Sequence, residues 1–315
     1  MTNKLLEVRN CSVRAQNHKA LISNITFSVG KNERVGIIGE SGSGKTMTIK
    51  ALLGIVPNDL KVTAETIKLG DVDLLNCTDK ERKEIVGTQV GFVPQNTVAY
   101  LHPLIKIKKQ MTDGFMTYKM GTLEQARQKA MELLKLVGIA DPERIMNSYP
   151  GELSGGMRQR VNIAMALMCN PRLIIADEPT TALDCIVQKQ VTELFFRLSM
   201  EKETAVLMVS HNLNMLKKYC DRIVVMYAGQ IVEMGEKEQI FQNPRHPYTR
   251  ALIDVIPKLN QDRSKPLTEI PGYVPEVNRD RSDCLFYDRC KYAEERCRQT
   301  LPSYTDDSHY VKCIL

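Results

Sequence analysis

The chain has 315 residues, of which 43% are hydrophobic and 25% charged, and a formal net charge of +6 at pH 7. That length and balance are typical of a globular enzyme with one or two domains. No apolar run approaches the roughly 18 residues that span a bilayer, and no signal-peptide core follows Met1. We therefore expect a cytosolic protein that reaches a membrane only by docking on membrane-spanning subunits. The mild charge, without Lys/Arg runs interleaved with aromatics, gives nucleic acid little support as a partner.

The first 95 residues are expected to be rich in strands, and a phosphate-binding loop is predicted at 39–46. The apolar run 34–39 predicts a buried parallel strand that leads into the loop. The loop then enters a predicted helix over 45–53, which Gly54 ends. This strand–loop–helix order is the context that the motif GxxxxGK[ST] requires.

The loop is expected to bind the phosphates of ATP. Its glycines let the backbone wrap closely and aim N–H groups at phosphate oxygens, and the helix N-terminus adds positive potential. Lys45 is expected to reach the β- and γ-phosphates, and the Thr46 hydroxyl to ligate Mg²⁺. The predicted ATP-binding residues are Gly39, Glu40, Ser41, Gly42, Ser43, Gly44, Lys45 and Thr46.

Further along the chain, the apolar run 171–179 contains two carboxylates where a predicted buried strand ends. Ligands of open α/β sheets lie beyond the carboxyl ends of the strands. Asp177 is therefore expected to hold Mg²⁺ through water, next to Thr46. Glu178, one residue further, is expected to accept a proton from the attacking water.

A second glycine-rich element lies at 153–160 and begins Leu153-Ser154-Gly155-Gly156. At the start of a helix, its exposed amides form an anion site. In most phosphate-loop proteins such an element cannot serve the nucleotide held by the same chain. Its presence therefore indicates an ATPase whose two subunits sandwich two ATPs between them.

Together these elements resemble the nucleotide-binding subunit of ATP-binding-cassette (ABC) transporters over about residues 1–250. The resemblance implies an α/β fold with a RecA-like core, an antiparallel β part and a helical subdomain at about 98–160. The predicted nucleotide-binding domain spans 1–256, and a small cysteine-rich C-terminal extension spans 257–315. The resemblance rests on Gly39–Thr46, Gln95, Leu153–Gly156, Leu173–Glu178, Ala182–Asp184 and His211.

The family implies that two subunits pack head to tail. Ser154 and the amides of Gly155 and Gly156 would then contact the γ-phosphate of the ATP held by the opposite subunit. Asp184 resembles the residue that links the two sites across such a dimer.

The family also implies roles for two residues that follow predicted strands. Gln95, after 89–94, resembles the glutamine that reaches Mg²⁺ and the attacking water. His211, after 205–210, resembles the histidine that contacts the γ-phosphate and orients Glu178. The sequence departs from the family at 12–18, where many such domains stack an aromatic on adenine and this chain has none. Either Arg14 stacks there instead or adenine is held weakly.

Four of the nine cysteines lie in the last 32 residues: Cys284, Cys290, Cys297 and Cys313. A short tail with little apolar content cannot build a core alone, which favours a metal staple. The close C-x₂₋₄-C pairs of most zinc sites are absent. Three alternatives therefore remain for these cysteines: a four-thiolate iron–sulfur cluster, a zinc site, or unligated thiols packed in a small subdomain.

The tail also resembles the oligopeptide/dipeptide/nickel branch of ABC importers, through His246–Leu252, Ile270–Pro275 and the four cysteines. In that branch the cysteines can bind a [4Fe–4S] cluster, which favours iron–sulfur over Zn²⁺. The branch implies a second, similar ATPase subunit in a heterodimer, two membrane-spanning permease subunits and an extracellular solute-binding protein. The chain would then work as a peripheral ATPase on the cytoplasmic face of the membrane.

Two other functions have less support in the sequence. A soluble ABC ATPase of DNA repair or translation usually has long coiled-coil insertions or two cassettes, and this chain has neither. A non-catalytic metal-binding regulatory cassette would not need Lys45, Glu178 and His211, which are all present. The cargo is not determined by these residues, because binding protein and permease choose it.

Overall fold

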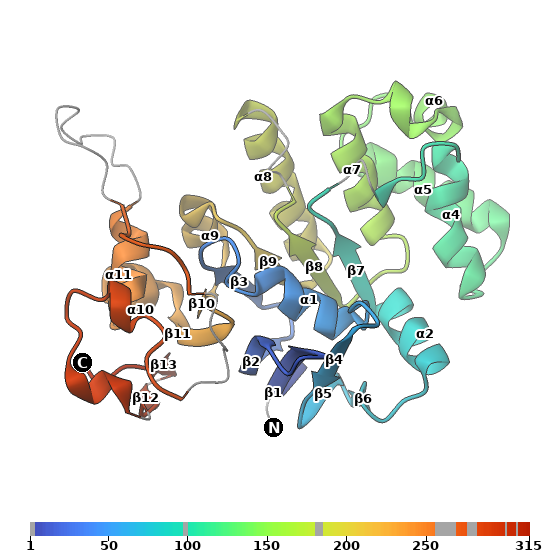
Figure 1. Ribbon diagram of the computed structural model, residues 1–315. Coiled ribbons are helices and arrows are strands. Elements are labelled where there is room, and N and C mark those ends of the chain that lie inside the picture. Colours follow the sequence, from blue (N-terminus) through green and yellow to red (C-terminus); the bar gives the residue numbers. More distant parts are fainter. Residues whose placement is uncertain are drawn as a thin grey trace. The chain divides into compact units, whose positions relative to one another are not determined.

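The computed structural model describes residues 4–96, 100–179, 185–255, 269–275, 282–299, 301–306 and 308–315. They belong to two compact units, each built from separate stretches of chain (Figure 1). The helical unit comprises Met1–Leu5, Val29–Glu33 and Asn76–Met208. The loop unit comprises Leu6–Ser28, Arg34–Leu75 and Val209–Leu315.

The loop unit contains an antiparallel sheet in the order β2-β1-β5-β6, with β4 also paired to β1. Its strands alternate between buried and exposed residues, as β2 does, which is typical of a sheet with one face on the core. The strands are β1 (Lys4–Ala15), β2 (Ala20–Gly30), β4 (Leu60–Thr63), β5 (Thr66–Leu69) and β6 (Val72–Asp73).

A second set of strands in the loop unit has the order β12-β13-β11-β10-β3. β3 and β10 are parallel, with Ile38 opposite Val225, and the remaining pairs are antiparallel. The strands are β3 (Arg34–Ile38), β10 (Arg222–Tyr227), β11 (Gln230–Glu236), β12 (Tyr304–Asp306) and β13 (His309–Val311). The helices of this unit are α1 (Lys45–Leu53), α9 (Leu213–Tyr219), α10 (Lys237–Gln242), α11 (Pro247–Asp254), η2 (Tyr287–Arg289) and η3 (Glu295–Arg298).

The helical unit contains the strand order β9-β8-β7, and β8 and β9 are buried along their whole length. Such continuous aliphatic burial is typical of parallel strands covered on both faces. The elements are β7 (Val90–Val93), β8 (Leu173–Asp177), β9 (Ala205–Val209), α2 (Asp79–Gln89), α4 (Ile107–Thr117), α5 (Leu123–Leu136), α6 (Pro142–Asn147), η1 (Pro150–Glu152), α7 (Gly155–Ala166) and α8 (Cys185–Glu201).

The predicted helical segment is confirmed by α4, α5, α6 and α7, which lie side by side within this unit (Figure 1). Thr122 caps α5 and forms a capping box with Gln125. The helix buries the apolar stripe that its sequence spacing predicts, namely Ala126, Ala130, Leu133 and Leu134.

Helix α2 lies in a region that we expected to be rich in strands. It buries none of its residues, so it has no apolar stripe that a periodicity search could detect. The local signal is its N-terminus, where Thr78 and Glu81 form a capping box.

The C-terminal tail packs on the rest of the loop unit. β13 pairs with β11, with Val311 opposite Glu233. The His309 ring Nε2 lies 2.7 Å from Glu233 Oε1, and the two side chains are 2% and 0% exposed. Phe286 packs against Tyr227, with ring centroids 5.2 Å apart. The tail thus shares a core with β10 and β11 and does not have to build its own.

The predicted domain boundary after residue 256 lies outside the described residues. Across the described part of the chain, no helix combines the length and the apolar character that crossing a bilayer requires.

We predict that Gly91→Ala destabilises the protein. A Cβ at Gly91, on β7, would lie 2.4 Å from the Ala166 carbonyl oxygen of α7, so backbone would have to move. The expected cost is about 1–3 kcal/mol, measured as a lower unfolding temperature. Gly114→Ala in α4 is the control, since a Cβ there meets nothing within 4 Å. It should raise stability by about 0.5–1 kcal/mol, and equal effects of the two changes would contradict the packing described here.

Candidate nucleotide-binding site

The phosphate loop leaves β3 and enters α1, as predicted. Gly44 caps α1 with φ 100°, and Gly39 has φ 153°. A Cβ at Gly44 would lie 2.6 Å from Ile22 Cγ2, so both space and backbone angle require glycine. The loop is tied to the β10–β11 turn, because the Gly229 N–H donates to the Ser43 carbonyl at 2.9 Å. The N-terminus of α1 therefore faces the loop with its backbone N–H groups, as an anion site requires.

The Lys45 ammonium is buried inside this loop. It donates to the carbonyl oxygens of Gly39 and Glu40, each at 2.9 Å. Thr46, the next residue, is exposed at the first turn of α1. The Lys45 side chain is thus turned into the loop, and the Thr46 side chain is accessible to a ligand.

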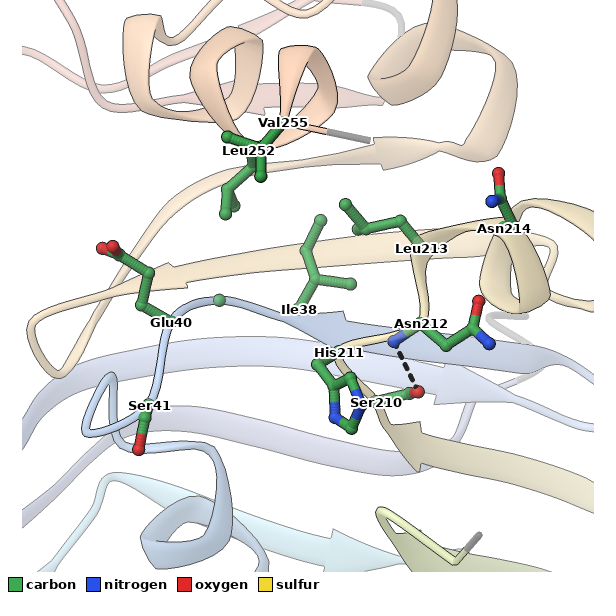
Figure 2. A pocket seen from close by; sticks show the side chains of 11 residues that line it. Ile38, Glu40, Ser41, Ser210, His211, Asn212, Leu213, Asn214, Leu252 and Val255 are labelled. Carbon is green, nitrogen blue, oxygen red and sulfur yellow. Dashed lines mark hydrogen bonds between the residues drawn. The ribbon is translucent and has the colours of Figure 1, made fainter. Parts of the chain in front are cut away.

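A cavity of about 360 Å³ borders the start of the loop and is lined by both Ser41 and His211 (Figure 2). His211 and Ser210 lie on one side of it, and the apolar side chains of Leu252, from α11, and Val255, the C-cap of that helix, lie on the other. The turn at His211 is held by the Asn212 N–H, which donates to Ser210 Oγ at 3.0 Å. Within the loop unit, the predicted histidine therefore lines the same cavity as the phosphate loop.

In the helical unit, Gln95 and Glu178 come together at neighbouring strand ends. β7 and β8 are parallel with Val93 opposite Ala176, so the residues two positions further on reach the same edge. Gln95 Nε2 donates to Glu178 Oε2 at 3.2 Å. Glu178 has φ 44°, a left-handed conformation that is costly for a residue with a Cβ and that often marks a functional position.

Asp177 ends β8 and is 4% exposed, directly before Glu178. Within the helical unit, its carboxylate and the Gln95 amide oxygen are hard oxygen ligands of the kind that Mg²⁺ prefers. The donor chemistry of these two residues therefore fits Mg²⁺.

Ser154 is the N-cap of α7 and accepts a hydrogen bond from the Met157 N–H at 3.3 Å. The side chain is exposed, and Gly155 and Gly156 form the first turn behind it. This turn presents backbone amides to solvent, as an anion site requires. Asp184, predicted to link the two sites of a dimer, lies outside the described residues.

Residues 12–18, where the sequence has no aromatic to stack on adenine, border a cavity of about 530 Å³. Arg14 and His18 are among the residues that line it. The Arg14 guanidinium donates to Thr63 Oγ1 at 3.4 Å. An arginine plane is thus present beside this cavity.

The four tail cysteines interact electrostatically with one another. Burial, with smaller effects from the other three thiols, raises the pKa of Cys284 to about 12. Burial likewise raises the pKa of Cys290 and Cys313. Among the described residues, no three His, Cys, Asp or Glu side chains are grouped to hold a metal ion. Metals bind the thiolate, so ligation would require these thiols to lose their protons.

Two residues that contact the phosphate loop were not predicted. The Glu40 N–H donates to Tyr248 Oη at 2.8 Å, and the Arg289 guanidinium binds the Glu40 carboxylate. The tail motif that contains Tyr248 indicated a family branch, but nothing in its local pattern indicates that the ring reaches the loop.

Family comparisons agree with this geometry. The ABC transporter family matches residues 22–181, and the oligopeptide/dipeptide transporter C-terminal region matches 232–297. The dipeptide transport ATP-binding protein DppD of Escherichia coli is 40% identical over 314 residues, covering 98% of this chain and 96% of that protein. The oligopeptide transport ATP-binding protein OppD of Bacillus subtilis is 39% identical over 322 residues, covering 99% of this chain and 89% of that protein.

Solved structures show the same fold. The ATP-binding cassette MJ0796, in a dimeric post-hydrolysis state bound to ADP and Pi, superposes with a TM-score of 0.65 at 27% identity. The match covers 74% of this chain and 98% of that one. The chain therefore belongs to the ABC transporter family, as an ATP-hydrolysing subunit that carries the oligopeptide/dipeptide transporter C-terminal region.

Proposed function

We propose that this ATPase powers peptide uptake by an ABC importer, with ATP held between two such subunits. The observation that supports the catalytic part is the hydrogen bond between the Gln95 amide and the Glu178 carboxylate at adjoining strand ends. The left-handed backbone conformation of Glu178 supports it further. The names of the relatives support dipeptides or oligopeptides as cargo over nickel.

In this proposal the phosphate loop binds ATP through its backbone amides, with Lys45 on the β- and γ-phosphates. Thr46, Gln95 and Asp177 would hold Mg²⁺, which supplies positive charge to the transferring phosphoryl group. Glu178 would accept the proton of the attacking water, and Gln95 would orient that water. His211 would contact the γ-phosphate, which its place beside Ser41 supports.

The second ATP contact would come from another subunit. The exposed N-terminus of α7, with Ser154, Gly155 and Gly156, would bind the γ-phosphate of the facing ATP, and Asp184 would couple the two sites. What supports this is the N-cap geometry and the dimeric state of the solved ATP-binding cassette. We propose a heterodimer with a second ATPase subunit.

The remaining partners follow from import. Two permease subunits would form the path through the membrane, and an extracellular solute-binding protein would deliver the peptide. The chain would dock on the cytoplasmic face. We also propose the division into a nucleotide-binding domain, 1–256, and an extension, 257–315, in which the match at 232–297 supports a distinct C-terminal region.

An iron–sulfur cluster on Cys284, Cys290, Cys297 and Cys313 is the finer proposal for the tail. The mutual electrostatic effects of these thiols support it. Ligation would require the thiols to lose their protons and move together, since their described arrangement forms no ligand group.

Glu178→Gln is predicted to keep ATP binding and to lower the hydrolysis rate by about 10²-fold or more, because the amide cannot accept the proton. Uptake of labelled dipeptide by cells that carry this variant as their sole copy should fall in parallel. Glu203→Gln is the control, since Glu203 also has a positive φ, 51°, in the same unit. Wild-type hydrolysis by Glu178→Gln would refute the assignment.

Ser154→Arg should leave nucleotide binding by this chain nearly intact, because the loop that binds ATP is elsewhere in the sequence. Hydrolysis by the assembled transporter should fall, since a bulky cation would occupy the space of the facing γ-phosphate. Ser154→Thr keeps the capping hydroxyl and is the matched control. Loss of ATP affinity by the isolated arginine variant would contradict the two-subunit site.

The cluster proposal predicts about four irons per chain in protein purified without oxygen, with visible absorption from iron thiolates. Metal analysis of the purified protein distinguishes an iron–sulfur cluster, a zinc site and unligated thiols. One zinc per chain without colour would assign the site to zinc, and the absence of both metals would leave packed thiols as the role of these cysteines.

A further inference from the structure

Glu40, the second residue of the phosphate loop, is held at three points. Its N–H donates to Tyr248 Oη at 2.8 Å, and its carbonyl accepts from Lys45 Nζ at 2.9 Å. Its carboxylate accepts from Arg289 Nη1 at 2.8 Å and from Nη2 at 3.0 Å. The loop conformation next to Ser41 is thus tied to α11 and to the C-terminal tail.

Arg289 is built into this position rather than resting on the surface. Its side chain is only 5% exposed. The guanidinium also donates to the carbonyls of Pro271, at 2.6 Å, and Ile270, at 3.2 Å, and to Tyr227 Oη at 3.3 Å. The hydrogen bonds to Glu40 are the largest cause that raises the pKa of this guanidinium, so its charge is constant.

The charges give this contact a consequence for nucleotide binding. A carboxylate in a loop that binds a triphosphate repels the ligand, because like charges at short range disfavour one another. A bidentate guanidinium cancels that charge and fixes the side chain away from its other rotamers. Arg289 lies at the end of η2, one residue before Cys290, so the tail supplies this compensating charge.

We propose that Arg289 is a positioning residue of the ATP site, through which the C-terminal tail sets the affinity of the phosphate loop for ATP. The arginine neutralises Glu40 and holds it, and Glu40 in turn holds the loop. The proposal deepens the proposed function at the ATP site, and hydrolysis by the unmodified protein tests that function separately.

The test is the KM for ATP and the kcat of the full chain. Arg289→Gln should raise KM about tenfold and leave kcat within about threefold, because the groups that act on water are not touched. Glu40→Gln should lower KM about threefold, because it removes the repelling charge and keeps the arginine. This variant retains every other contact of Arg289, so it tests the charge of Glu40 alone. A rise in KM with Glu40→Gln overturns the proposal.

The double variant, Glu40→Gln with Arg289→Gln, separates charge from general stability. Its KM should be at least about threefold below that of Arg289→Gln, since no unpaired carboxylate remains. Arg298→Gln is the matched control in the same tail, because that guanidinium lies over the Tyr287 ring and does not contact the loop. An unchanged KM in Arg289→Gln, or a double variant as weak as the single one, also overturns the proposal.

Discussion

The parallel register of the buried strands is the constraint on which the site depends. Because Val93 lies opposite Ala176, β7 and β8 reach nearly the same level, and in the loop unit β3 ends at Ile38, opposite Val225. Beyond β7, β8 and β3 the backbone leaves the sheet and turns, whereas β10 continues to Tyr227 beside β11. In the helical unit this turn brings an amide and a carboxylate within hydrogen-bond distance, and in the loop unit it opens the phosphate loop. Chemistry at the strand ends is thus a result of strand pairing.

Local patterns were sufficient for the strands that lead to the site. The apolar runs at 34–39 and 171–179 were predicted because a strand that is buried on both faces is continuously apolar. Helix α2 was not predicted, because a helix that buries nothing has no apolar period. The packing of the tail was not predicted either. Its core comes from Tyr227 and Glu233, which lie on strands that are distant in sequence.

In the site too, only residues that stand in local motifs could be predicted from the sequence. Gly39–Thr46 and Glu178 stand in short motifs whose spacing is itself the chemical requirement. The partners of Glu40 have no such spacing, because Tyr248 and Arg289 are 208 and 249 residues further along the chain. Pairs of that kind arise from tertiary packing, and a single sequence does not reveal them.

The pairing of β13 with β11 has a consequence for how the protein is made. The loop unit contains both the phosphate loop and β13, so its sheet is completed only after the ribosome has added residues 309–311. Contacts of such long sequence separation form slowly, because a large loop must close first. The phosphate loop is therefore made long before the strand that completes its unit's sheet, and before Arg289, which contacts Glu40.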